Sequence, residues 1–122
     1  MALRTHKDLD VWKKAIKLVT NIYRVTEGFP NNEIYGITSQ IRRSVISIPS
    51  NIAEGSARNG DRDFLRFLNI AMGSHAELET QLIIANNLEY LNDEDFTSLM
   101  SANDEIGRML AGLINYQKKK LK

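Results

Sequence analysis

Residues 40–55 read Gln-Ile-Arg-Arg-Ser-Val-Ile-Ser-Ile-Pro-Ser-Asn-Ile-Ala-Glu-Gly, and they hold the pattern that decides the fold. Branched apolar residues recur every three or four positions before and through this stretch, which is the spacing of one face of an α-helix. They are Ile34, Ile37, Ile41, Val45, Ile48 and Ile52. Because proline lacks an amide hydrogen, we expect Pro49 to kink or locally break the helix. The stretch predicts a long helix over about residues 33–57.

The same apolar spacing predicts three more helices, over about residues 8–27, 61–89 and 94–119. The first of them carries two adjoining apolar stripes, which is typical of a helix with two packing neighbours. One stripe consists of Leu9, Trp12, Ile16, Val19 and Tyr23, and the other of Val11, Ala15, Leu18, Ile22 and Val25. Asn92 or Asp93 is suited to cap the last helix.

Four long amphipathic helices joined by short connections predict an all-α fold, an up-down-up-down four-helix bundle. For a chain of 122 residues we expect a single domain over residues 1–122. Gly73 lies inside the third helix, where glycine is about 1 kcal/mol less favourable than alanine. We therefore expect a neighbouring backbone to approach Gly73 closely.

The composition excludes several classes of chemistry. The chain has 43% apolar and 25% charged residues but no cysteine, which excludes disulfides, thiolate metal sites, iron–sulfur clusters and cysteine nucleophiles. No apolar run of about 18 residues occurs, so we expect no membrane-spanning helix and no membrane partner. Residues 1–7 lack the apolar region of a secretory signal, and we expect a cytoplasmic protein.

The net charge of +1 conceals an uneven distribution of charge along the chain. Residues 1–66 contain 11 basic and 7 acidic residues, residues 67–117 contain one basic and 8 acidic residues, and residues 118–122 contain four lysines. One interpretation is that helix faces of opposite charge attract one another within the fold or between subunits. The other is that a basic face binds a polyanion.

A row of polar residues borders the isoleucine stripe of the 33–57 helix at intervals of three and four. It carries small hydroxyl and amide side chains, and the third helix offers hydrogen-bond partners for them. The row consists of Gln40, Ser44, Ser47, Asn51 and Glu54, and we call it, together with Arg43 and with Ser74 and Glu77 of the third helix, the polar seam. Arg42 and Arg43 are expected to pair with its carboxylates. Three interpretations stay open: a satisfied network that sets helix register or a subunit contact, a contact with a ligand or nucleic acid, and an ordinary exposed face.

No catalytic or metal-binding motif occurs in the chain. A di-iron site in a helical bundle uses Glu-x-x-His units, and neither His6 nor His75 follows a glutamate by three residues. His75 lies on an apolar stripe and is expected to be a packed, hydrogen-bonded histidine. Nucleophile-elbow and phosphate-loop sequences are absent, and nothing beside Glu54 and Glu77 indicates acid–base tuning. We expect no enzyme and no cofactor.

Basic residues supply the candidate nucleic-acid contacts. Arg58, Arg62 and Arg66 are spaced four residues apart around the start of the third helix, so that they can line one face. The full candidate set is Lys13, Lys14, Lys17, Arg42, Arg58, Arg62 and Arg66. The acidic second half of the chain argues against a surface that is basic throughout.

Five strings resemble one protein family across nearly the whole chain. They are Asp-Leu-Asp-Val-Trp-Lys-Lys-Ala at 8–15, Gln-Ile-Arg-Arg-Ser at 40–44, Ile-Pro-Ser-Asn-Ile-Ala-Glu-Gly at 48–55, Phe-Leu-Arg-Phe-Leu-Asn-Ile-Ala-Met-Gly-Ser at 64–74 and Glu-Leu-Glu-Thr-Gln-Leu at 77–82. The chain resembles the bacterial four-helix bundle proteins encoded in intervening sequences of 23S ribosomal RNA genes. The accessory variability determinant of diversity-generating retroelements is similar to them.

This resemblance implies a four-helix bundle that assembles into a ring-like homopentamer. It implies no established activity for most members, whereas the retroelement protein binds nucleic acid and its reverse transcriptase through a basic surface. The signature positions, most of which look architectural, are Arg43, Pro49, Asn51, Glu54, Gly55, Gly73, Ser74 and Glu77. We predict a non-enzymatic, oligomeric scaffold associated with RNA or DNA. The alternative is a scaffold that binds a protein partner and makes no nucleic-acid contact.

Overall fold

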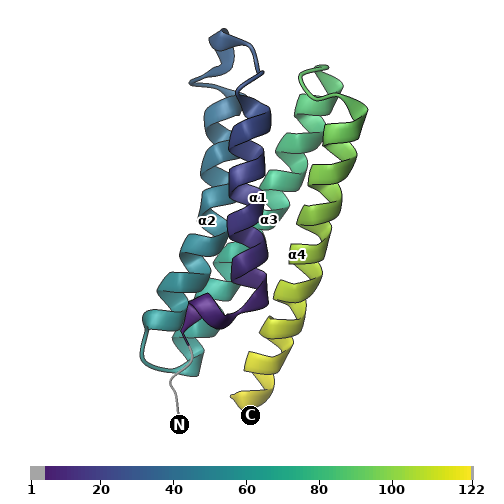
Figure 1. Ribbon diagram of the computed structural model, residues 1–122. Helices are drawn as coiled ribbons and strands as arrows, with labels where there is room; N and C mark the ends of the chain where they lie inside the picture. The colour runs from purple at the N-terminus through teal and green to yellow at the C-terminus, as the bar shows by residue number, and fades with distance from the viewer. Residues whose placement is uncertain (1–4, 122) are drawn as a thin grey trace.

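All four predicted helices form, and they run alternately up and down around a shared apolar core (Figure 1). The computed structural model describes residues 5–121. The elements are η1 (His6–Asp8), α1 (Asp10–Thr26), η2 (Asn31–Glu33), α2 (Ile37–Ala57), α3 (Asp61–Asn87) and α4 (Asp93–Lys120), where η denotes a 3₁₀-helix. Residues 5–121 contain no strand, and the predicted all-α bundle is confirmed.

Two helices begin later than the apolar spacing predicts, because a short 3₁₀ turn precedes each of them. Thr5 caps η1 by accepting a hydrogen bond from the Lys7 amide, and α1 then begins at Asp10 instead of residue 8. The turn η2 likewise precedes α2, which begins at Ile37 instead of residue 33. Ile34 consequently lies outside the helix and is 53% exposed, so its predicted place in the apolar stripe is wrong.

The α2 helix continues through Pro49, so the local break that we considered does not occur. The proline is buried. Four α2 residues around it, at intervals of three and four, are each fully buried in the core: Ile41, Val45, Ile48 and Ile52. Burial of one such side chain stabilises a fold by about 1.5–3 kcal/mol, and this gain offsets the hydrogen bond that proline cannot make.

The core is contributed by all four helices, and α1 and α3 occupy opposite corners of it. Both of these helices pack against α2 and against α4 (Figure 1). Gly55 lies where α2 meets α3, and a Cβ atom added there would sit 2.6 Å from the Cβ of Phe67. Glycine therefore permits the close approach of these two helices near their connecting turn. Within residues 5–121, no helix has the length and apolar character of a membrane span.

At the other end of the bundle, a hydrogen bond joins the segment before α2 to the connection between α3 and α4. The Tyr90 hydroxyl donates to Glu33 Oε2 at 2.9 Å, and the Tyr90 ring packs on Phe29 with centroids 5.6 Å apart. The hydrogen bond to Glu33, followed by burial and the charge of the carboxylate, raises the pKa of Tyr90. Asn92 caps α4 as predicted, because its Oδ1 accepts from the Asp95 amide at 2.7 Å.

A polar pair is buried between α3 and α4. Asn103 is completely buried, and its Nδ2 donates to the carbonyl oxygen of His75 at 3.2 Å. Its Oδ1 lies 2.9 Å from His75 Nδ1, and because the first bond fixes the amide orientation, His75 must carry its proton on Nδ1. The prediction of a packed, hydrogen-bonded histidine is confirmed, whereas the core position of Asn103 was not predicted.

We expect Gly107→Ala to lower the free energy of unfolding by about 1–3 kcal/mol. A Cβ atom at Gly107 would lie 2.5 Å from His75 Nε2, and the hydrogen bonds to Asn103 prevent the imidazole from moving aside. The measurement is urea unfolding. The control is Gly112→Ala on the same helix, where a Cβ atom meets no described atom within 4 Å, so that stability should rise by up to about 1 kcal/mol. Equal effects of the two substitutions would contradict the packing described here.

Candidate functional site

The middle of the polar seam forms a hydrogen-bonded contact between α2 and α3. Ser47 Oγ lies 2.7 Å from Ser74 Oγ, and Asn51 Nδ2 donates to both the carbonyl oxygen and Oγ of Ser47 at 2.8 and 2.9 Å. Ser44 and Ser74 are buried, while Ser47 and Asn51 are half-buried. Small side chains at these positions let the two helices pack closely and keep their polar atoms paired.

The ends of the polar seam are exposed, and they make different contacts from those predicted. Gln40, Arg43, Glu54 and Glu77 all face solvent. Glu54 Oε2 accepts from Arg58 one turn away at 2.9 Å, in an exposed ion pair.

Arg42 does not pair with a seam carboxylate, so that prediction is wrong. It lies on the α1 side of α2, where its Nε donates to Thr26 Oγ1 at 2.9 Å and its guanidinium stacks 4.5 Å from the centroid of the Tyr23 ring. Arg42 therefore ties α2 to the last turns of α1.

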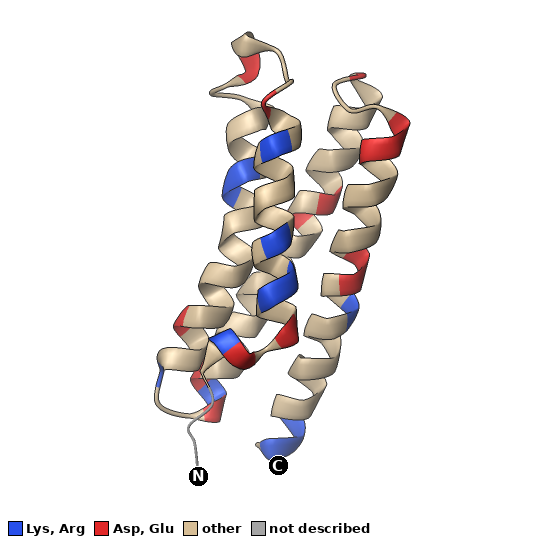
Figure 2. Cartoon of the chain, in the orientation of Figure 1, with Lys and Arg blue, Asp and Glu red and all other residues tan. Residues whose placement is uncertain are grey.

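The seven candidate nucleic-acid residues do not gather on one face. Lys13, Lys14 and Lys17 are exposed on α1, whereas Arg62 and Arg66 are exposed on α3 at the opposite corner of the bundle. Figure 2 shows basic bands on α1 and acidic bands on α3 and α4. The continuous basic surface that the spacing allowed is thus divided into separate groups.

Several of these cations are already engaged within the chain. Lys14 Nζ lies 3.1 Å from Glu105 of α4, and Arg66 lies 3.7 Å from Asp63. The guanidiniums of Arg58 and Arg66 stack on the Phe67 ring, at 5.2 and 4.6 Å from its centroid. Within residues 5–121, Lys13 and Lys17 form no ion pair, and they point away from the buried face of α1.

A first apolar groove, which we call groove A, runs between α1 and α2. Its volume is about 260 Å³, and it is lined mainly by Trp12, Ile16, Val19, Ile46 and Pro49. Ile16 and Ile46 remain 40% and 39% exposed. The second apolar stripe of α1 therefore extends beyond the core and is left partly uncovered.

A second groove, groove B, lies on the other side of α2, along α3. Its volume is about 400 Å³, and its lining includes Gln40, Gly73, Glu77, Thr80 and Ile84. A Cβ atom at Gly73 would meet no described atom within 4 Å, so the predicted close approach of a neighbouring backbone is wrong within this chain. The glycine instead leaves the floor of groove B open to the exterior.

The residues of the chain do not assemble a metal centre in the described region. Within residues 5–121, no group of three or more histidine, aspartate or glutamate side chains is arranged to hold a metal ion. Glu54 and Glu77, the carboxylates considered as an acid–base pair, are both exposed.

A comparison with protein families matches residues 7–112 to the 23S rRNA-intervening sequence protein family. The chain belongs to this family. The match spans α1, α2, α3 and the part of α4 up to residue 112, and it includes the whole polar seam and the residues that line both grooves. A comparison with curated protein sequences gives no match.

A solved structure supports the same assignment. It is the crystal structure of a protein with unknown function from the S23 ribosomal protein family of Bacteroides thetaiotaomicron. The two proteins are 28% identical, with a TM-score of 0.80, and the match covers 86% of this chain and 95% of the other. The bundle is thus shared over nearly its whole length.

We expect Ser47→Ala to destabilise the bundle by about 1–2 kcal/mol, because it removes the partner of Ser74 and one partner of Asn51 in a half-buried contact. Glu54→Ala serves as the seam control and should change the stability of the chain by at most about 1 kcal/mol, since it removes an exposed ion pair. Thermal unfolding of both variants measures the difference. A larger loss of stability for Glu54→Ala than for Ser47→Ala would mean that the exposed end of the seam, and not its half-buried middle, contributes more to stability.

Proposed function

We propose that this chain is a non-enzymatic scaffold whose copies assemble into a ring-like homopentamer, and that the assembly associates with nucleic acid through exposed cations of α1. The observation that carries the proposal is the presence of two different uncovered grooves on opposite sides of α2. The family resemblance of the sequence implies a homopentamer, and two uncovered grooves on each copy are consistent with such an assembly.

Two distinct grooves favour a head-to-tail contact, in which groove A of one copy receives the groove B side of the next. An interface of this kind joins different surfaces and closes into a ring when the rotation between copies permits. The exposed face of α3 beside groove B has the interval of three and four residues that helix–helix seams use. Its positions are Ile70, Gly73, Glu77, Thr80, Ile84 and Leu88. Glycine at the centre of this face lets a partner helix approach closely.

Nucleic-acid association is supported by the cations that the fold leaves free. Lys13, Lys17 and Arg24 recur at intervals of four and seven on the solvent face of α1, opposite its buried residues. Cations in such a row neutralise successive phosphates without reading base sequence. The alternative function is a scaffold that binds a protein partner and makes no nucleic-acid contact.

We expect light scattering of the wild-type chain to give a mass of about five times 13.9 kDa. Gly73→Leu should reduce this mass, because the leucine fills the space that a second copy needs, although it meets no described atom of its own chain. Gly112→Leu is the matched control, since Gly112 is an equally open position on α4, and its mass should stay that of the wild type. A monomeric wild type at micromolar concentration would contradict the proposed assembly.

We expect the protein to retard a structured RNA in a gel at about 50 mM salt, with an affinity that falls steeply as salt increases. Combined Lys13→Gln and Lys17→Gln substitutions should weaken binding and reduce the magnitude of the salt slope by about 1 per lost phosphate contact. Lys14→Gln is the control on the same helix, because Lys14 is already paired with Glu105. No retardation at this salt concentration would favour the protein-binding scaffold instead.

A further inference from the structure

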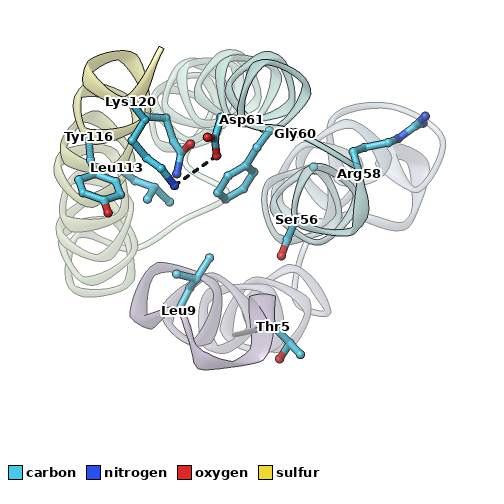
Figure 3. A pocket seen from close by; sticks show the side chains of 12 residues that line it. Thr5, Leu9, Ser56, Arg58, Gly60, Asp61, Leu113, Tyr116 and Lys120 are labelled. Atoms are coloured by element: carbon cyan, nitrogen blue, oxygen red, sulfur yellow. Dashed lines mark ion pairs between the residues drawn. The ribbon is translucent and has the colours of Figure 1, made fainter. Parts of the chain in front are cut away.

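The connection between α2 and α3 contains an asparagine followed directly by a glycine, Asn59-Gly60. Every other asparagine of the chain precedes a residue larger than glycine, and most of them lie inside α-helices. Residues 58–60 form a bend in which all three are exposed. Figure 3 looks onto this end of the bundle, where Gly60 borders a hollow of about 380 Å³ and the Arg58 side chain points away from it. Water therefore has access to this connection.

The backbone nitrogen of Gly60 is not engaged in secondary structure. Within residues 5–121 it donates no backbone hydrogen bond, whereas the carbonyl oxygen of Gly60 accepts from the Phe64 amide at 3.3 Å. An amide inside an α-helix donates to a carbonyl four residues earlier and is held away from the side chain before it. Gly60 instead precedes α3 with φ 114°, and a Cβ atom added there would meet no described atom within 4 Å. The space around this nitrogen is open.

The carboxamide of Asn59 is equally free to move. In the part of the chain that the structure describes, the asparagine side chains that form hydrogen bonds are those of Asn21, Asn51, Asn92 and Asn103, and not that of Asn59. Asn92 also lies outside an α-helix, but its Oδ1 accepts from the Asp95 amide at 2.7 Å. A carboxamide held in this way does not rotate toward its own backbone, whereas that of Asn59 does.

We propose that Asn59 is a site of spontaneous modification, at which the chain deamidates itself and acquires a carboxylate just before α3. The Gly60 nitrogen attacks Cγ of Asn59, a carbon–nitrogen bond forms, and a cyclic succinimide results. The attacking nitrogen gives up its proton, and the side-chain nitrogen leaves as ammonia. Water then adds to one of the two ring carbonyl groups and opens the ring to aspartate or isoaspartate. Water is the only co-reactant, and no electron is transferred.

The modification changes the charge of this end of the bundle. The new carboxylate follows directly after Arg58, whose guanidinium already pairs with Glu54, and it lowers the net charge of +1 by one unit. The positive end of the α3 dipole favours a carboxylate near the first turn, so the product is compatible with the fold. Isoaspartate also adds one methylene group to the backbone of the turn. This inference goes beyond the proposed function and requires neither assembly nor the α1 cations.

The first test is to incubate the folded chain at mildly alkaline pH and to map its peptides by mass spectrometry. The peptide that contains Asn59 should gain the mass that distinguishes a hydroxyl from an amino group. The gain should be faster at higher pH, because the attacking nitrogen must lose its proton. The peptide that contains Asn92 is the internal control and should stay unchanged, since its carboxamide is held by the Asp95 amide.

The second test identifies the products. An isoaspartyl methyltransferase, supplied with labelled S-adenosylmethionine, should methylate aged wild type and leave aged Asn59→Gln unlabelled, because the longer glutamine side chain closes a ring far less readily. The aspartate product should elute from an ion-exchange column together with Asn59→Asp. Equal labelling of aged wild type and aged Asn59→Gln would overturn the inference.

The third test asks whether the fold leaves the site open. The rate of modification at Asn59 in the folded chain should be of the same order as in the chain unfolded by guanidinium chloride, since neither the Gly60 nitrogen nor the carboxamide is held in the native structure. A native rate far below that of the unfolded chain would mean that the fold protects Asn59, and it would also overturn the inference.

Discussion

The close packing of α2 on α3 is the constraint on which the rest of the structure depends. Gly55 allows the backbone of α2 to approach Phe67, and one hydrogen bond joins Ser47 to Ser74 further along the same contact. A bulky residue at either level would separate the helices, and an unpaired hydroxyl there would be unfavourable. Because these two contacts set the spacing and register of the pair, they also set the shape of groove B.

The chain carries more apolar surface than its own core can cover. In α1 one stripe is buried and the adjoining stripe, around Ile16, forms the wall of groove A. Ile70 and Ile84 on α3, and Leu88 directly after it, are similarly exposed. Isolated exposed apolar side chains are ordinary, but grouped ones on two sides of one molecule are typical of interaction surfaces. This bundle therefore has two partly apolar faces, one along groove A and one along groove B.

The helix packing decides which of the charged side chains pair with one another and which remain exposed. The basic first half and the acidic second half meet at the contact between α1 and α4, where Lys14 pairs with Glu105. Other cations are held by aromatic rings and neighbouring carboxylates, as Arg42 and Arg66 are. What remains for an external partner is a narrower set of cations than the composition suggests.

Much of the fold follows from the sequence, because apolar residues at intervals of three and four can bury one face only as a helix. Four such stripes, interrupted at short turns, determined the all-α bundle and placed His75 in a packed position. The helix starts were less predictable, since the 3₁₀ turns before Asp10 and Ile37 depend on local capping and chain reversal. The sequence also indicated that Ser47 and Ser74 needed partners, without showing that they would find each other.

Tertiary structure alone decided which side chains share a space. Asn103 lies in the core because the peptide carbonyl and imidazole of His75 on another helix satisfy its amide, which no local pattern reveals. Gly73, by contrast, faces outward although its position inside a helix suggested a close neighbour. Periodicity determines which face of a helix is buried, whereas the partner across that face is determined by residues distant in the chain.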